Sequence, residues 1–131
     1  MPPLVPTSMS TSTDTRQRVA VVIYEDAAKD LARAYRGLMT AVEFLEAGDD
    51  VTVVYDGSGV DTLAAASTEG HQLHSLVERL RPVTRGACAF CVKAHGVGDA
   101  VAAGDWSLLE EYKHHASVRN LVVEGYQLLS F

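Results

Sequence analysis

Cys88 and Cys91 are the two cysteines of the chain, and they stand three residues apart. A pair this close is no disulfide framework and is typical of redox, metal or nucleophilic chemistry in a reducing compartment. Cys88 falls at the end of a predicted strand, just ahead of a predicted helical turn. The positive end of such a turn lowers the pKa of a thiol and favours the nucleophilic thiolate. The pattern therefore predicts chemistry at Cys88, assisted by Lys93 and His95, with inert burial of both thiols as the alternative.

The same residues also allow a metal-binding interpretation. Cys88 and Cys91 have the spacing of two thiolate ligands, and His95 is a candidate third ligand. A structural zinc site requires four ligands. His114 or His115 could supply the fourth, but the sequence holds no second cysteine pair. Zinc binding through Cys88, Cys91 and His95 is therefore the weaker alternative.

Three loops that follow predicted strands would surround the cysteines. Ligands in open parallel sheets bind outside the carboxyl ends of the strands. The loops at those ends are Tyr24–Asp26, Asp56–Val60 and Cys88–Cys91. They converge only if their three strands are neighbours, which the sequence alone leaves open. If they converge, the site also includes Tyr24, Glu25 and Asp56 as supporting residues.

The second loop is rich in glycine. Its backbone N–H groups at Gly57, Ser58 and Gly59 are candidates for binding an anion. The loop lacks the full dinucleotide-binding glycine pattern, and no phosphate-loop Lys-Ser or Lys-Thr follows it. A tight turn at the end of a strand is the alternative interpretation.

Apolar runs predict the elements that carry these loops. Arg18–Tyr24 and Val51–Tyr55 are short, β-branched and without alternation, which is typical of strands buried on both faces. Weaker signals predict further strands at Gly86–Phe90, Trp106–Leu109 and Tyr126–Phe131. Helical spacing, with Gly or Pro at several ends, predicts helices over Asp30–Ala47, Asp61–Ala66, His71–Arg81, Cys91–His95, Asp99–Ala103 and Ser117–Glu124.

The order of these elements predicts the fold. Strands and helices alternate, which favours an α/β fold: a single three-layer domain whose sheet has about five, mainly parallel strands, with helices on both faces. The long helix should pack through one apolar stripe, formed by Leu31, Tyr35, Leu38, Val42 and Leu45. The last helix should point three side chains inward, those of Val118, Leu121 and Val122. Pro82 should stop the helix over 71–81.

Length and charge limit the class of protein. The 131 residues suffice for one domain, which we expect over residues 18–131 behind a disordered tail over residues 1–17. The net charge of -6 argues against nucleic-acid binding, which relies on neutralising phosphates. No apolar run reaches the roughly 18 residues that span a bilayer. The start lacks the pattern of a secretory signal, so we expect a cytoplasmic protein.

The residues around the cysteines resemble the DsrE/DsrF-like sulfur-relay family. The likeness runs from Arg18 to Phe131 and includes the opening strand. It also includes four further segments: Gly48–Val51 leading to Tyr55–Gly59, Gly86–Cys91, Gly96–Val97 and Leu121–Phe131. In sulfur-carrying members a cysteine ends the third strand, eight residues before a Gly-Val pair. Cys88 stands at that interval from Gly96–Val97, so Cys88 is the matching cysteine and Cys91 is additional.

The resemblance implies a persulfide carrier. Cys88 would accept sulfane sulfur from a donor protein and pass it to an acceptor thiol, without metal or organic cofactor. The family fold is a five-stranded, mainly parallel sheet that assembles into homo-oligomers, either trimers or hexamers. Cys91 departs from the relay members and could convert a Cys88 persulfide into a disulfide. The alternative function is a non-catalytic oligomeric binding module for a small anion or a partner protein.

Overall fold

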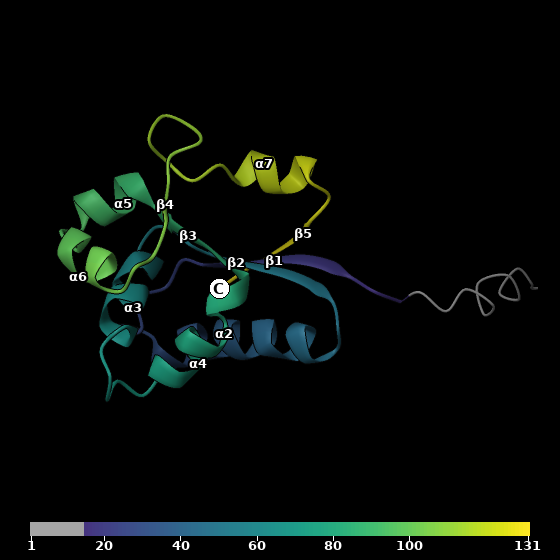
Figure 1. Cartoon of the computed structure of the whole chain (residues 1–131), viewed down its shortest axis with the longest axis horizontal. Helices are drawn as coiled ribbons and strands as arrows, with labels where there is room; N and C mark the ends of the chain where they lie inside the picture. Colours follow the sequence, from purple (N-terminus) through teal and green to yellow (C-terminus); the bar gives the residue numbers. More distant parts are fainter. Residues whose placement is uncertain (1–14) are drawn as a thin grey trace, which may run out of the picture.

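The fold is built on one five-stranded sheet. The structure, a computed structural model, describes residues 15–131 (Figure 1). Residues 1–14 of the predicted disordered tail therefore lie outside the described residues. The strands are β1 (Arg18–Ile23), β2 (Asp50–Tyr55), β3 (Thr84–Cys88), β4 (Leu108–Leu109) and β5 (Gln127–Ser130). They are all parallel, in the order β4-β3-β2-β1-β5. The predicted α/β fold with a parallel sheet is confirmed.

Helices cover both faces of this sheet. They are α2 (Leu31–Glu46), α3 (Gly59–Ala66), α4 (His74–Arg79), the 3-10 helix η1 (Arg81–Val83), α5 (Ala89–Ala94), α6 (Gly98–Ala103) and α7 (Val118–Val123). Figure 1 shows α2 and α4 on one side of the sheet and α7 on the other, which is the predicted three-layer arrangement. Within the described part of the chain, no helix combines the length and the apolar character needed to cross a membrane.

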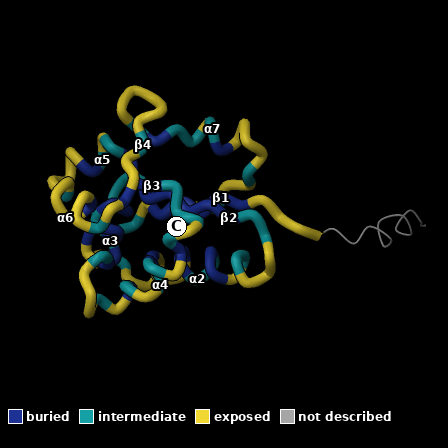
Figure 2. The backbone as a smooth tube through the Cα atoms, in the orientation of Figure 1, coloured by how far each residue is buried: buried dark blue, intermediate teal, exposed yellow. Residues whose placement is uncertain are grey.

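The central strands are buried on both faces, as the lack of apolar–polar alternation in their sequences predicts. Every residue from Val19 to Ile23 and from Val51 to Tyr55 is buried, which Figure 2 shows as a dark blue centre. Because successive side chains of a strand point to opposite faces, β3 sends Ala87 into the larger core beneath α2 and Cys88 into the smaller core beneath α7. The candidate nucleophile therefore lies on the more thinly covered side of the sheet.

The long helix α2 packs through a different stripe from the predicted one. Its N-terminus is capped by Asp30, whose carboxylate accepts a hydrogen bond from the Arg33 backbone N–H at 3.0 Å. Leu38 and Val42 are buried as expected, but Leu31 and Tyr35 are 38% and 42% exposed. The buried face instead includes the small residues of the helix, Ala34, Gly37 and Ala41. Small side chains let the helix approach the sheet closely, and that rotates Leu31 and Tyr35 towards solvent.

Two predictions for the elements around the cysteines are wrong, one for the end of a strand and one for the buried face of a helix. The strand predicted over Gly86–Phe90 ends at Cys88, and Ala89 already begins α5. Val122, predicted to point inward, is 55% exposed, whereas its neighbour Leu121 is buried. With only six residues, α7 presents a narrow face to the sheet, and Leu121 occupies that face.

The helix predicted over His71–Arg81 is also shorter than expected. The α-helical part is His74–Arg79. Ahead of this helix, the ring of His71 accepts a hydrogen bond from the Leu73 backbone N–H at 3.0 Å. Pro82 does not terminate the α-helix directly but lies within η1. Proline has no N–H to donate and is therefore tolerated in the first turn of such a helix.

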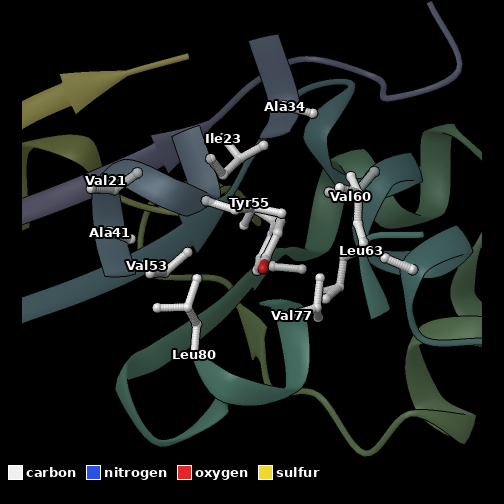
Figure 3. Close-up of a cluster of buried hydrophobic side chains, with 14 of the residues drawn as sticks. Val21, Ile23, Ala34, Ala41, Val53, Tyr55, Val60, Leu63, Val77 and Leu80 are labelled. Carbon is white, nitrogen blue, oxygen red and sulfur yellow. The ribbon is translucent and has the colours of Figure 1, made fainter. Parts of the chain in front are cut away.

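Tyr55 forms the centre of the larger core. Figure 3 shows its ring among the apolar side chains of that core, which come from the sheet and the helices below it. The side chain is fully buried, and its hydroxyl has no hydrogen-bond partner among the described residues. Burial raises the pKa of Tyr55 well above its usual range, so the hydroxyl is neutral in the fold.

Candidate functional site

The sheet topology brings the three predicted loops together. β2 lies between β1 and β3, and the registers pair Ile23 with Tyr55 and Tyr55 with Ala87. The three strands therefore end at nearly the same level, and their loops meet at one edge of the sheet. This neighbourhood is the condition that the sequence left open, and it places the loop residues near the two cysteines.

Cys88 is completely buried. It ends β3 and is the residue directly before α5, and its side chain lies in the smaller core with Val54, Ala116 and Leu121. The Cys88 sulfur accepts a hydrogen bond from the Ala116 backbone N–H at 3.4 Å. This burial of Cys88 keeps reagents away from the thiol.

Cys91 lies one helical turn later and is only half-buried. Its thiol donates to the carboxylate Oδ1 of Asp56 over 3.5 Å, and the ligand-type atoms of Asp56, Cys88 and Cys91 all lie within 4.8 Å of one another. Burial, followed by hydrogen bonding with Cys88, raises the pKa of Cys91 to about 12, against a smaller lowering by the Gly57 backbone. Cys91 is therefore a neutral thiol at physiological pH.

Asp56 is held in place by its own loop. Its backbone N–H donates to the Ile23 carbonyl at 3.0 Å, and its Oδ1 accepts from the Gly57 N–H at 2.8 Å. The Gly59 N–H donates to the Asp56 carbonyl at 2.8 Å. Because the N–H groups of Gly57 and Gly59 are engaged within the loop that also contains Ser58, the anion-binding interpretation gains no support here.

Gly59 is required by the close approach of α3 to β1. A Cβ atom at Gly59 would lie 1.8 Å from the Ile23 carbonyl oxygen, which is far inside van der Waals contact. Only glycine lets the helix start so close to the end of the strand. The glycine pattern of this loop thus serves the position of Asp56 and α3.

Tyr24 borders the site on the β1 side. The residue is 41% exposed, and its ring lies against Gly57, where an added Cβ would be 3.2 Å from Tyr24 Cδ1. Burial, and then repulsion by Asp56 and by the ionised forms of Cys91 and Cys88, raises the pKa of Tyr24. Oε1 of the neighbouring Glu25 accepts a hydrogen bond from the Asp26 backbone N–H at 2.9 Å, so the Glu25 carboxylate is engaged within its own loop.

Two further predicted supporting residues, His95 and Lys93, are not part of the cluster formed by Asp56, Cys88 and Cys91. The ring of His95 is hydrogen-bonded to the carboxylate of Asp61 on α3. Lys93 is exposed on α5 and lines a surface groove. The predicted zinc set with His95 is therefore not assembled, and Asp56 takes the place beside the two cysteines.

The remaining zinc candidates, His114 and His115, belong to a segment that covers Cys88. We call Tyr112–Ala116 the cover segment. Tyr112 and His115 are bridged through their backbones, and the two residues between them, Lys113 and His114, have positive φ angles of 48° and 66°. Two positive angles define a tight turn that usually requires Asn or Gly, so these larger residues hold the turn under strain.

The cover segment is fastened to the first turn of α5. The Phe90 backbone N–H donates to the His114 carbonyl at 2.8 Å, and the Phe90 ring stacks on His115 with 4.3 Å between ring centroids. Together with the Ala116 hydrogen bond to Cys88, these contacts close the smaller core over the sulfur. Within the cover segment, Ala116 is the residue whose backbone contacts the sulfur of Cys88.

A groove of about 990 Å³ lies on the outer side of α5. Apolar atoms dominate its wall, and charged or polar side chains stand around it, including Lys93, Asp99, Glu110 and His114. Among the described residues, neither Cys88 nor Cys91 lines this groove.

Comparisons of the chain with models of protein families, with curated proteins and with solved structures find no match. The site is therefore defined by its own geometry. That geometry includes residues that the sequence did not suggest, namely Asp61, Phe90 and Ala116. Ala116 acts through its backbone and leaves no sequence signal, whereas the helical position of Phe90 beside a cysteine could have marked it as a neighbour.

Proposed function

We propose that this protein carries sulfane sulfur as a persulfide on Cys88, in intracellular sulfur transfer or thiol redox chemistry. The observation that carries the proposal is the thiol pair at the carboxyl end of β3, where Cys88, Cys91 and Asp56 approach within 4.8 Å. The resemblance to the DsrE/DsrF-like sulfur-relay family supports it, because the position of Cys88 before Gly96–Val97 is that of the sulfur-carrying cysteine. The five-stranded parallel sheet agrees with the fold that the resemblance implies.

Loading of Cys88 balances without an external oxidant. The Cys88 thiolate attacks the terminal sulfur of a donor persulfide, R–S–SH. A bond forms between Cys88 Sγ and that sulfur, which keeps its proton, while the S–S bond of the donor breaks and releases R–S⁻. The donor is reduced to a thiolate as Cys88 is oxidised to a persulfide. An acceptor thiolate then repeats the step and regenerates Cys88.

Cys91 provides a second fate for the loaded sulfur. Its thiol can attack Sγ of the Cys88 persulfide, so that a Cys88–Cys91 disulfide forms and the outer sulfur leaves as hydrogen sulfide with the Cys91 proton. The raised pKa of Cys91 slows this step, because the attacking species is the thiolate. We therefore expect the persulfide to survive long enough for transfer when an acceptor is present.

Access to Cys88 depends on the cover segment. Cys88 has no exposed surface, so a donor persulfide reaches it only when Tyr112–Ala116 moves away. The strain at Lys113 and His114 lowers the cost of that movement. Sulfur transfer would then be limited by opening of the cover segment rather than by the intrinsic reactivity of the thiol.

A comparison of three chains tests the proposal. The wild-type chain, Cys88→Ser and Cys91→Ser are reduced, exposed to a small-molecule persulfide and followed by intact mass over time. We expect the wild type and Cys91→Ser to gain the mass of one sulfur atom, with slower loss from Cys91→Ser, because its disulfide route is absent. Loading of Cys88→Ser to the same extent would move the role to Cys91 and refute the proposal.

The complete burial of Cys88 favours a second candidate function, a non-catalytic binding module for a small anion or a partner protein. In that case both thiols would be packing groups and the outer groove on α5 would be the binding surface. Fast alkylation of Cys88 in the folded chain at neutral pH would exclude this candidate. Alkylation no faster than global unfolding would favour it.

We further propose that the protein is a cytoplasmic homo-oligomer, a trimer or hexamer as the resemblance implies. Exposed apolar side chains near the site support association, since Phe90, Leu108 and Tyr112 are each about half or more exposed. Light scattering coupled to gel filtration measures the assembly directly. A monomer at micromolar concentration would refute the proposed assembly and would leave the proposal of persulfide chemistry at Cys88 unaffected.

A further inference from the structure

Asp56, Cys88 and Cys91 bring three metal-ligand groups to one point at the carboxyl edge of the sheet. Their ligand-type atoms, one carboxylate oxygen and two sulfurs, all lie within 4.8 Å of one another. Asp56 follows β2, Cys88 ends β3 and Cys91 lies on α5, so the juxtaposition is a product of the fold. We propose that these three residues bind a thiophilic divalent cation of the zinc type, a property that goes beyond the proposed sulfur transfer.

The spacing is close to that of a tetrahedral site. Zinc–sulfur and zinc–oxygen bonds of their usual lengths place neighbouring ligand atoms about 3.6–3.8 Å apart. The Cys91 sulfur and Asp56 Oδ1 are already 3.5 Å apart. With every other separation at most 4.8 Å, closure onto an ion needs a shift of only about 1 Å. Side-chain rotation at the half-buried Cys91 can supply that shift.

The donor set selects the class of cation. Two thiolates favour zinc and other thiophilic ions, whereas magnesium and calcium require a shell of oxygen ligands that one carboxylate does not provide. Three protein ligands leave the fourth tetrahedral position for water or an exogenous thiolate. The arrangement therefore matches the open type of zinc site rather than the closed structural type.

Neighbouring backbone groups hold two of the ligands in place. The Ala116 N–H donates to the Cys88 sulfur at 3.4 Å, and the Gly57 N–H donates to Asp56 Oδ1 at 2.8 Å. Such outer hydrogen bonds orient ligands and are a regular part of metal sites. His95, by contrast, is bound to Asp61, so we exclude it from the ligand set.

Binding balances as a simple exchange. The cation loses water ligands and forms bonds to Asp56, Cys88 and Cys91, while the two thiols release their protons to solvent. No electron is transferred, so the same residues remain available for persulfide chemistry once the metal is removed. Metal and sulfane sulfur therefore compete for Cys88. Metal binding is measured in the absence of a persulfide, and persulfide loading is measured in the absence of metal.

Cobalt(II) alone is the probe that reports on these ligands. The full chain is reduced, stripped with a chelator and titrated with cobalt(II). We expect one ion per chain, with a sulfur-to-cobalt charge-transfer band and visible bands typical of tetrahedral cobalt, both abolished by added zinc. Absence of the charge-transfer band in the wild type would overturn the proposal, and it would leave the persulfide experiment unaffected.

Variants then identify the ligand set. Loss of an outer hydrogen bond to a ligand costs about 10- to 100-fold in metal affinity, so removal of a ligand in Cys91→Ser should cost on the order of 100-fold or more. Asp56→Asn should reduce the affinity for cobalt(II) by at least about 10-fold and keep the sulfur-to-cobalt charge-transfer band. His95→Gln is the matched control and should bind as the wild type does.

Three outcomes of the variant series would overturn the assignment. These are unchanged affinity in Cys91→Ser, unchanged affinity in Asp56→Asn, or loss of binding in His95→Gln. Circular dichroism checks that each variant folds, and Cys91→Ala replaces Cys91→Ser if the serine variant does not. Retained wild-type affinity in that replacement would count equally against the site.

Discussion

The backbone N–H of Ala116 donates a hydrogen bond to the sulfur of Cys88 across 3.4 Å, although the two residues are 28 positions apart in the chain. This contact ties the cover segment to the candidate nucleophile. It both satisfies the buried sulfur and closes the path to it, so reactivity at Cys88 and movement of Tyr112–Ala116 are coupled.

Weakening the cover segment should speed reaction at Cys88. Phe90→Ala removes the ring that stacks on His115, an interaction worth about 0.5–1.5 kcal/mol. We expect the alkylation rate of Cys88, measured in a Cys91→Ser background, to rise roughly 2- to 10-fold. Val123→Ala, an exposed apolar change on α7, is the control and should leave the rate unchanged. Equal rates in Phe90→Ala and the control would show that the cover segment does not gate Cys88.

The raised pKa of Cys91 makes the stability of the fold sensitive to alkaline pH. Folding raises this pKa from 9.0 to about 12, so the folded state binds a proton that the unfolded state releases within that interval. The stabilising contribution is complete below pH 9.0 and is lost as the pH rises through about 12. Urea unfolding of the wild type and Cys91→Ser across this range should show the stability advantage of the wild type shrinking. An advantage that grows with pH would contradict the assigned shift.

The buried hydroxyl of Tyr55 should be dispensable for stability. Because it has no hydrogen-bond partner among the described residues, Tyr55→Phe removes an unsatisfied polar group and leaves the ring in place. We expect the free energy of unfolding to stay level or to rise by about 1 kcal/mol. Tyr112→Phe, on an exposed ring, should have no effect. A loss of stability in Tyr55→Phe that the control does not share would reveal a partner for the hydroxyl.

Gly59 and Gly98 should respond in opposite directions to alanine. At Gly59 the new Cβ would lie 1.8 Å from the Ile23 carbonyl oxygen, so we expect a loss of about 3 kcal/mol or more. At Gly98, which begins α6, the nearest atom is Val92 Cγ1 at 4.0 Å, and alanine should stabilise by about 0.5–1 kcal/mol. Thermal unfolding measures both. A tolerated Gly59→Ala would mean that α3 and β1 can separate.

The strands could be predicted because their signal is local. The runs Val19–Ile23 and Val51–Tyr55 are apolar at every position except Thr52, and a strand with that pattern is typically buried on both faces. The orientation of α2 could not be predicted in the same way. The large residues Leu31 and Tyr35 fit the helical spacing, but the small residues of α2 control how close it comes to the sheet.

The candidate site could be predicted in its position but not in its detail. The convergence of Tyr24, Asp56 and Cys88 follows from the strand order, which depends on contacts far apart in sequence. The burial of Cys88 depends on a segment that returns 28 residues later. The pairing of His95 with Asp61 joins α5 to α3 and has no local pattern.

The mass of the intact chain gives the most direct test of sulfur transfer at Cys88. The reduced wild-type protein is incubated with a persulfide donor, freed of excess reagent, weighed by mass spectrometry and digested to locate the modification. We expect a gain of one sulfur atom on the peptide that contains Cys88, and its removal when an acceptor thiol is added. An unchanged mass, or a sulfur atom found on Cys91 alone, would contradict the persulfide function of Cys88.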